Sequence, residues 1–468
     1  MKIKHVAWFV ALMSSSTLFA LDGLDWEAGS RLTVGNGTNA PFLTTANAYD
    51  RYSFDPTALN TWGSVHKRTD TSKRIDVGFG LELDAQAGFR HSNDRLFDGE
   101  MYGLVKAIGF QLFAGRMRSV YGNQDPLLSS GGMIWSQNAR PMHRIGLESD
   151  GYIPVPFTKG WVEVMGGLTH GWFEKETLTK HTLLHHKYAH IRIGGSGMFR
   201  LNYGLQHTAQ WAGSSERYGV VEPSFSNYKR IFLGKSGDET APLTDQINTL
   251  GNHMISKMVG LDLQLPTLKL GLYWQNLSED PPVLRMDQAY NVEDGLWGLS
   301  MRFPKNNWLS AVVLEYLCTT DQSGPWHDLD GVIYGGTDSY YNNGVYPNGW
   351  SFYGMTIGNP WLTSPKYNEN GIVSFQNNKV RLYYFSGNGS FSTYSYKVTV
   401  AYSQNYGSPQ NIFDNCKKQL SYQIEASTPL SMLKSTRVSL ALSGDHGKMY
   451  GNNFAALLGI SYSGLFDY

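Results

Sequence analysis

A strict alternation of apolar and polar side chains, sustained over long stretches, constrains this chain more than any other feature. In residues 75–87 every odd-numbered position is apolar and every even-numbered position is polar or glycine. Successive side chains of a β-strand point to opposite faces, and strands of soluble proteins usually have about five or six residues. A strand that crosses an outer membrane needs about 9–11 residues, with one face toward lipid and the other toward a polar lumen. The stretch therefore favours a membrane-spanning strand.

The same alternation recurs along the chain. It is found in residues 199–206, 259–265, 268–274, 396–403, 420–425 and 438–442. Turn-rich stretches separate these segments, as the meander of an antiparallel sheet requires. From Phe454 to the terminal Tyr468 one strand face is again largely apolar. A last strand that ends in an aromatic residue is typical of outer-membrane barrels.

The composition narrows the alternatives. Lys and Arg (39) balance Asp and Glu (39), and charged residues make up 17% of the chain, against roughly 25% in soluble domains. A neutral chain without a basic block is a poor nucleic-acid binder, so we expect no nucleic-acid partner. Tyr and Trp gather near the ends of the alternating segments, as in the aromatic girdles of barrels. A soluble β-sandwich would have shorter strands and more charge.

These patterns predict an all-β fold, a transmembrane antiparallel β-barrel of about 18 strands (16–18), at roughly 25 residues per strand and connection. Lys2, Lys4, an apolar core at 6–13 and a small residue at Ala20 predict a signal peptide over residues 1–20. We therefore expect residues 21–468 to form one outer-membrane domain. Outer-membrane lipid and the barrel-assembly machinery are its expected partners during insertion.

Some segments do not alternate. Residues 40–60, 127–144 and 243–256 are expected to form short helices or lumen-filling loops that plug the barrel. Residues 319–370 are rich in Gly, Asn, Tyr and Trp, and so long an irregular stretch usually has a functional reason. We expect one or two long extracellular loops folded over the mouth.

Reactive and metal-binding motifs are sparse. Cys318 and Cys416 are the two cysteines, so the chain has neither a disulfide framework nor a Cys-based metal site, and one disulfide or two free thiols both stay open. A histidine cluster invites a metal interpretation, but strand geometry would split its members between two faces; it comprises His181, His185, His186 and His190. We therefore expect polar loop or lumen-wall positions, no metal and no other cofactor. No GxSxG motif marks a nucleophile, so we expect no enzyme.

Several motifs, in one order, resemble the capsule-assembly protein Wzi family. The run at residues 131–142 (GGMIWSQNARPM) is similar to the SG-x-x-W-S-x-NARP-M segment of that family. Further similar segments lie at residues 155–161, 168–173, 184–188, 250–253, 319–325, 341–346 and 349–354. The resemblance runs from about Asn47 to Glu425 and implies an outer-membrane barrel of about 18 strands whose lumen is plugged. It also implies a lectin-like protein that binds capsular or extracellular polysaccharide and retains it at the cell surface.

Sugar binding uses aromatic rings stacked on pyranose faces, with polar groups bonded to the hydroxyls. On this basis the candidate polysaccharide-binding residues are Trp135, Arg140, Asp321, Gln322, Trp326, Tyr346, Trp350 and Tyr353. Two alternatives stay open at the level of residues. Loop aromatics also pack loops against themselves, and Arg140 could form a structural ion pair with an acidic residue of the lumen wall. At the level of function, the alternative is a substrate-specific porin.

Overall fold

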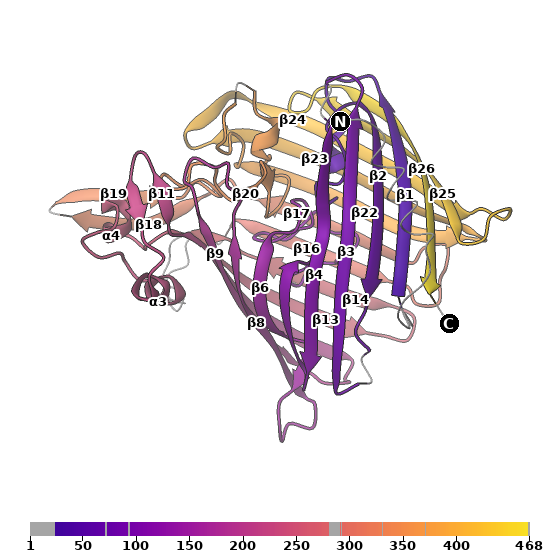
Figure 1. The fold of residues 1–468 in the computed structure, drawn as a ribbon, viewed down its shortest axis with the longest axis horizontal. Coiled ribbons are helices and arrows are strands. Elements are labelled where there is room, and N and C mark those ends of the chain that lie inside the picture. The colour runs from indigo at the N-terminus through magenta and orange to yellow at the C-terminus, as the bar shows by residue number, and fades with distance from the viewer. Residues whose placement is uncertain are drawn as a thin grey trace, which may run out of the picture.

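The computed structural model describes residues 24–70, 73–91, 94–279, 291, 293–329, 331–369 and 371–466. The signal peptide predicted over residues 1–20 lies outside this part of the chain. Antiparallel strands pair with their neighbours in sequence, and β1 pairs with β26 from Leu24↔Phe466 to Gly35↔Ala455, which closes the sheet into a barrel (Figure 1).

Eighteen strands surround the lumen in the described part of the chain, because the two-residue segments β7 and β15 continue β6 and β14 along the same partners. The strands are β1 Leu24–Gly35, β2 Thr57–Lys67, β3 Ile75–Gly88, β4 Arg95–Ala107, β5 Phe110–Arg116, β6 His143–Ser149 with β7 Ile153–Pro154, β8 Val162–Trp172, β9 Leu183–Ile193, β10 Phe199–Trp211, β13 Asn252–Gln264, β14 Lys269–Gln275 with β15 Ser278–Glu279, β16 Gly295–Arg302, β17 Ala311–Cys318, β22 Val380–Phe391, β23 Tyr394–Ser408, β24 Asn411–Pro429, β25 Thr436–Gly447 and β26 Asn453–Phe466. The predicted barrel class and strand number are confirmed.

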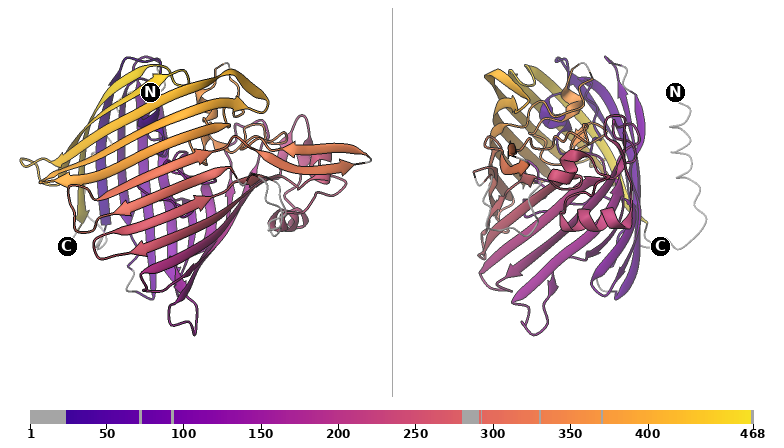
Figure 2. Two further views of the ribbon diagram at one scale, coloured as in Figure 1. Left: turned by 180° about the vertical axis from the view of Figure 1, so that it is seen from behind. Right: turned by 90° about the vertical axis from the view of Figure 1, so that its left-hand side faces the viewer.

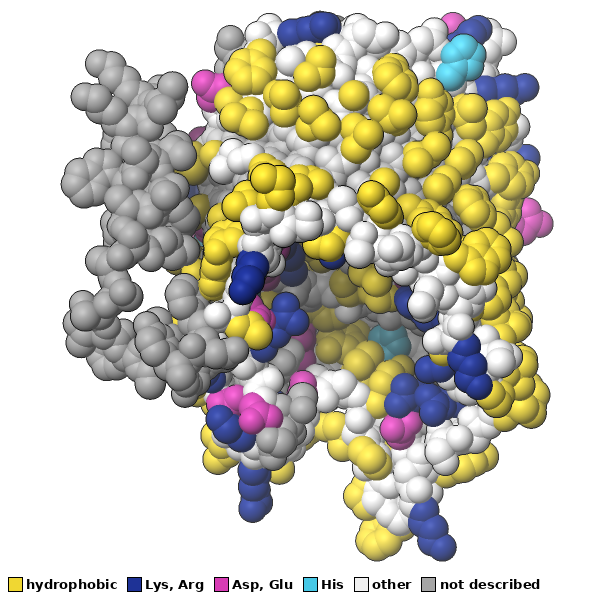
Figure 3. Space-filling model, turned by 90° about the vertical axis from the view of Figure 1, so that its right-hand side faces the viewer, with side chains coloured by type: hydrophobic (Ala, Val, Ile, Leu, Met, Phe, Trp, Pro, Cys, Tyr) yellow, Lys and Arg dark blue, Asp and Glu magenta, His cyan; other side chains and the backbone are white. Residues whose placement is uncertain are grey.

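The two faces of the sheet are inverted relative to a soluble protein. On β3 the apolar side chains are exposed, from Ile75 at 65% to Leu81 at 42%, while Glu82 and Asp84 are almost completely buried. A polar inner face and an apolar outer face are what a barrel in lipid requires. Figure 3 shows the apolar side chains spread over the outer wall.

The two rims of the barrel differ in loop length. One rim has tight connections, such as residues 108–109 between β4 and β5 and 392–393 between β22 and β23. The other rim has the long connections 36–56, 117–142, 212–251 and 319–379. Since outer-membrane barrels have short periplasmic turns and long extracellular loops, the long connections face the cell exterior.

Helices are few and short in the described part of the chain. They are α2 Phe42–Thr45, α3 Phe225–Leu233, α4 Leu243–Ile247 and the 3-10 helix η1 Pro365–Tyr367. Among the described helices none has the length and apolarity needed to cross a membrane. Among the residues that the structure describes, three short hairpins complete the fold: β11 Gly213–Ser215 with β12 Gly219–Val221, β18 Ser323–Leu329 with β19 Val332–Thr337, and β20 Ser351–Phe352 with β21 Met355–Thr356.

Three extracellular connections fold inward and fill the lumen; we call residues 36–56, 117–142 and 339–369 the plug. Their buried side chains form one apolar cluster that includes Phe42, Met133, Trp350 and Trp361. Polar residues of the wall hold the plug in place. Glu315 on β17 accepts hydrogen bonds from Ser129 Oγ and from the Ser130 amide, both at 2.6 Å.

Two expectations about the loops need correction. Residues 243–256 include the expected short helix, α4, but they do not enter the lumen, because Leu250 packs with Ala209 and Trp211 on the outward side of β10. Residues 252–256 already belong to β13. Residues 319–370 do not all lie over the mouth. The hairpin β18–β19 projects beyond the barrel (Figure 2), whereas residues 339–369 descend into the plug.

Because the outer face of the barrel is apolar, the cost of placing a charge on it should depend on how deep in the membrane the charge lies. Replacing Leu81, in the middle of β3, by Arg should cost about 2–4 kcal/mol of unfolding free energy in lipid vesicles, because a cation there faces hydrocarbon. The same change at Ile75, at the strand end, should cost about 0–1 kcal/mol. Urea unfolding followed by tryptophan fluorescence measures both values. Equal costs at the two positions would contradict a lipid-facing wall.

Candidate functional site

A cleft opens on the extracellular side of the plug. It consists of two adjoining hollows of 660 and 500 Å³, both lined by Asp94, Arg95 and Tyr353. Its walls come from the β3–β4 connection, the β8–β9 connection with Glu174, and residues 348–373. Three connections that are far apart in the sequence therefore meet at one accessible surface.

Tyr353 forms the aromatic surface of this cleft. Its side chain is 40% exposed, and the guanidinium carbon of Arg140 lies 4.4 Å from its ring centroid. The ring of Phe97 lies 3.9 Å from the same guanidinium. A cation packed against an aromatic face is attracted by the ring quadrupole, so Arg140 supports the Tyr353 ring from within the protein.

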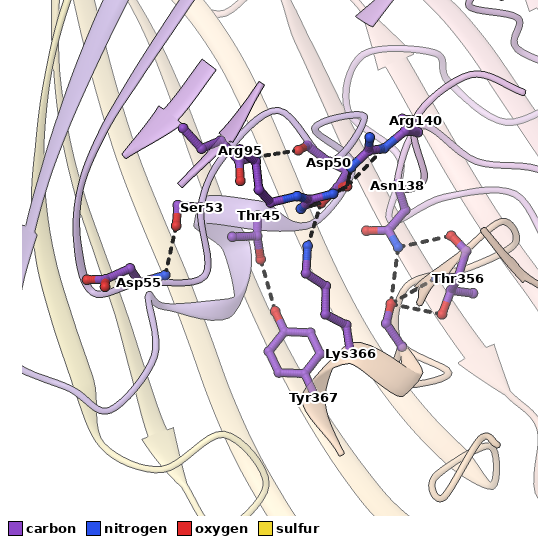
Figure 4. A network of polar contacts seen from close by, with 12 residues as sticks. Thr45, Asp50, Ser53, Asp55, Arg95, Asn138, Arg140, Thr356, Lys366 and Tyr367 are labelled. Carbon is purple, nitrogen blue, oxygen red and sulfur yellow. Dashed lines mark hydrogen bonds and ion pairs between the residues drawn. The ribbon is translucent and has the colours of Figure 1, made fainter. Parts of the chain in front are cut away.

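A buried carboxylate beneath the cleft binds three cations (Figure 4). Asp50 is fully buried and accepts from Arg140 Nη2 at 2.5 Å, from Arg95 Nη2 at 3.0 Å and from Lys366 Nζ at 2.8 Å. Asp50 belongs to the first plug segment and Arg140 to the second. Arg95 lies at the start of β4, and Lys366 lies in η1. An uncompensated charge at a buried site is costly, so the group is stable only when its members are together.

The motif at residues 138–140 joins the three parts of the plug. The Asp50 amide donates to the Asn138 carbonyl at 3.0 Å, and Asn138 Nδ2 donates to the Thr356 carbonyl at 3.0 Å. Arg140 adds its ion pair with Asp50. An amide with two donors and a planar guanidinium with five donors can each satisfy several backbone and carboxylate acceptors at once.

Burial shifts the pKa of two groups at the cleft. Burial raises the pKa of Glu174 to about 7, although the backbone amides of Glu174 and Tyr353 favour its ionised form. One Glu174 oxygen accepts from the Tyr353 amide at 2.8 Å, and the other is buried without a hydrogen bond. Burial also lowers the pKa of Lys366, against the opposing effect of Asp50.

The plug separates this cleft from a second hollow of 180 Å³ on the periplasmic side. That hollow is lined by plug residues such as Val120 and Leu127 and by wall residues near the short-connection rim, including Lys397 and Glu425. Figure 3 shows a hollow with charged side chains at this end of the molecule.

Five of the residues predicted to bind sugar are buried, and four of these, Trp135, Gln322, Tyr346 and Trp350, pack within the protein away from the cleft. Trp350 donates from Nε1 to the Ile134 carbonyl at 2.7 Å, and Trp135 lies beneath it with ring centroids 6.4 Å apart. Tyr346 donates to the Ala212 carbonyl, and Gln322 donates to the carbonyls of Thr319 and Asn378. Their burial favours a packing role, in line with the alternative that loop aromatics pack the loops.

The other candidates lie in two different places, at the cleft or outside it. Tyr353 lies in the cleft, and Arg140 lies directly behind it. Asp321 is exposed and binds Ser323 Oγ at 3.0 Å, outside the cleft lining. Trp326 lies on β18 opposite Gly335, and its side chain is outside the described residues. The Arg140 ion pair is present, but its partner Asp50 belongs to another plug segment and not to the lumen wall.

His185, His186 and His190 lie on two faces of β9, and His181 lies in the connection that precedes it. His186 and His190 face the lumen, where His186 stacks with Trp135 at 5.4 Å. His185 faces outward and is covered by Tyr228 and Phe232 of α3, so it belongs to neither the lumen wall nor a loop. No group of three or more potential metal ligands occurs in the described part of the chain. Cys318 and Cys416 are free thiols.

Sequence reasoning missed four residues of the site: Asp50, Arg95, Glu174 and Lys366. Asp50 lies in a segment predicted to plug the barrel, but its role depends on the loop conformation. Its positive φ of 53° turns the backbone so that the carboxylate meets Arg140. Asx residues tolerate this left-handed region better than most, which is the one local signal that was available.

A lipid-facing closed sheet with a filled lumen defines the chain as a plugged outer-membrane β-barrel. The sequence matches the capsule assembly protein Wzi family over residues 19–374. Because this match covers more than half of the chain, the protein belongs to the Wzi family.

The structure resembles solved outer-membrane barrels. Escherichia coli Wzi, described as an outer-membrane protein of group 1 capsule assembly and a carbohydrate-binding β-barrel, aligns with a TM-score of 0.61 and 14% identity over 98% of this chain and 86% of that one. OccAB2 of Acinetobacter baumannii aligns with a TM-score of 0.48 and 10% identity, covering 95% and 98% of the two chains. No curated protein sequence matches the chain significantly.

Removing the carboxylate of Asp50 should loosen the plug. The variant Asp50→Asn leaves three cations without a counter-charge, and the expected cost is about 3–5 kcal/mol. Denaturant-induced exposure of the buried plug tryptophans, read from their emission, measures this cost. In the control Asp25→Asn, the lost partner Arg68 has an 83% exposed side chain, so the cost should stay at about 1 kcal/mol or less. Similar costs for the two variants would refute a plug held by Asp50.

Glu174 should make the plug sensitive to pH. The pKa of Glu174 is raised from 4.5 to about 7 because burial disfavours its charged form. Its contribution to the free energy of unfolding is therefore complete below pH 4.5 and is lost as the pH rises through 7. The melting temperature of the plug should therefore be higher at pH 5 than at pH 8. Glu174→Gln keeps an acceptor for the Tyr353 amide and should reduce this difference. If the variant retains the full difference, Glu174 is not its source.

Proposed function

We propose that this protein binds capsular or extracellular polysaccharide in the extracellular cleft and retains it at the cell surface. The observation that carries the proposal is the exposed Tyr353 ring, held by Arg140 on the outer side of the plug. Membership of the Wzi family and the carbohydrate-binding description of Escherichia coli Wzi support the same conclusion.

The chemistry of the cleft suits a sugar polymer. An aromatic ring with one free face can stack on the apolar face of a pyranose, and Arg95, Gln86, Asn348 and Asn368 offer hydrogen-bonding groups around it. The lining also includes acidic residues, so Arg95, Arg116 and Lys366 are opposed by Asp94, Asp98 and Glu176. Because the two signs are balanced, recognition should depend on stacking and hydroxyl contacts more than on attraction of a polyanion.

The plug favours a binding surface over a channel. A substrate-specific porin needs a continuous aqueous path, whereas here an apolar cluster of plug residues lies between the outer cleft and the periplasmic hollow. The proposal contains no catalytic step and no cofactor. It includes a signal peptide removed near Ala20, insertion by the barrel-assembly machinery, and a belt of outer-membrane lipid.

Binding should depend on the Tyr353 ring. Tyr353→Ala removes a stacking surface worth about 0.5–1.5 kcal/mol, so polysaccharide binding should weaken by about two- to tenfold. Tyr353→Phe keeps the ring and should bind nearly as well as the wild type. Binding of purified surface polysaccharide to detergent-solubilised protein, by biolayer interferometry, measures the effect.

The control is Trp308→Ala, which removes an exposed aromatic ring in the connection between β16 and β17 on the periplasmic rim. Its affinity should equal that of the wild type. In cells, the amount of polymer retained after washing should follow the same order. If all three variants retain the wild-type affinity, the polymer does not bind on this cleft.

A further inference from the structure

Helix α3 lies on the outside of the barrel wall. Its Tyr228 packs on Trp211 with ring centroids 5.6 Å apart, and its Tyr228 and Phe232 both pack on His185 at 5.5 Å. Trp211 and His185 point outward, because the residues that precede and follow them in their strands point inward. Gln210 donates to the Gly349 carbonyl in the plug, and His186 stacks on Trp135.

The wall beneath α3 and its connection contains buried histidines beside apolar residues such as Ala209 and Trp211, whereas the lower wall is apolar. On β10 the outward residues Phe199 and Leu201 are exposed, but His207, farther toward the outer rim, is buried. On β13 Val259 and Leu261 are exposed in the same way, and His253 is buried. The connection between β10 and β13 therefore covers the level at which histidines appear among the outward side chains, as expected near the membrane interface.

A cation fixes the end of this helix to the wall. Lys187 on β9 lies with Nζ 3.8 Å from the centroid of the Phe232 ring, and it also donates to the Phe232 carbonyl. Gly234, with φ of 63°, ends the helix. A cation near a helix C-terminus is favoured by the helix dipole, so α3 has a defined seat on the barrel.

One flank of α3, beside the face that packs on the wall, is apolar and basic. Phe225 and Leu233, eight positions apart and on one helical face, are 74% and 53% exposed. Lys229, between them on that face, lies 5.2 Å from the Phe225 ring. From Phe225 to Lys235 the charged residues are Lys229, Arg230 and Lys235, with no acidic residue. Apolar side chains beside cations are the signature of a helix that lies in a membrane interface.

We propose that α3 is an interfacial anchor that binds anionic lipid of the outer leaflet. Phe225 and Leu233 insert among acyl chains, in continuity with the lipid-facing band of Leu201 and Leu261. Lys229 and Lys235 bind phosphate headgroups. The anchor sets the depth and the tilt of the barrel in the membrane on the side that carries the β10–β13 connection.

Depth-dependent quenching tests the position of the helix. In a Cys318→Ser/Cys416→Ser background, Phe225→Cys is labelled with bimane in the full-length protein in vesicles of phosphatidylethanolamine and phosphatidylglycerol with brominated acyl chains. Quenching should lie within about twofold of that at Leu201→Cys, in the lipid-facing band. It should exceed quenching at Lys175→Cys, an exposed residue of the same rim, by at least about threefold. Aqueous iodide should give the reverse order.

If the label at Phe225 behaves like that at Lys175, the helix is in water and the proposal is overturned. If lipid quenching is low and energy transfer between labelled copies rises with protein density, the face binds a second copy, which also overturns it. Because each label reports its position without any binding assay, these outcomes do not depend on polysaccharide binding.

Lipid composition tests the basic residues. Native mass spectrometry should show about fivefold more phosphatidylglycerol than phosphatidylcholine retained per protein, as one lysine near an anionic surface would give. Lys229→Gln with Lys235→Gln should bring this ratio close to one. The control Lys305→Gln, exposed at the periplasmic rim, should leave it unchanged. A ratio that the double variant does not alter would overturn the headgroup contact.

Discussion

The exclusion of water from the bilayer forces every lipid-facing backbone group into a hydrogen bond, and only a closed sheet satisfies that demand with strands. Pairing of β1 with β26 provides the closure. The alternation of side chains then places apolar residues such as Leu81 in lipid and acidic residues such as Glu82 inside. The rest of the molecule follows from this arrangement, because an 18-stranded barrel has a lumen too wide for its own wall side chains to fill.

In this protein the lumen is filled by connections that return from the extracellular rim. An apolar cluster supplies the bulk of the packing, and the Asp50 carboxylate with its three cations fixes how the segments meet. The same contacts place Arg140 behind Tyr353. The side chain that stabilises the plug therefore also presents the aromatic surface of the cleft, which links the stability of the interior to binding at the surface.

The barrel could be predicted from the sequence because alternation is a local signal. The alternation in residues 75–87 predicts both a strand and which of its faces contacts lipid, and the structure confirms the strand as β3. An ion pair between Arg140 and an acidic residue could be predicted from the sequence, but Asp50 could not be identified as the partner. Asp50 is ninety positions away, and its own left-handed backbone conformation places its carboxylate. Contacts of that kind depend on tertiary structure.

The aromatic residues show the same limit. Trp350 and Tyr353 belong to one Gly- and Tyr-rich loop with no internal periodicity, yet the first is buried and the second is 40% exposed. The loop sequence contains no feature that separates them, since the separation arises when the loop enters the lumen. His185 illustrates the converse case: strand parity places it on the outer wall, but parity cannot show that α3 returns to cover it.

Planar-bilayer recording of the purified protein tests the central claim most directly, namely that the plug converts a barrel of porin size into a closed binding surface. The account predicts no steady conductance for the wild type, and stable open channels once residues 127–142 are replaced by a short Gly-Ser linker. A steady open channel in the wild-type protein would contradict it.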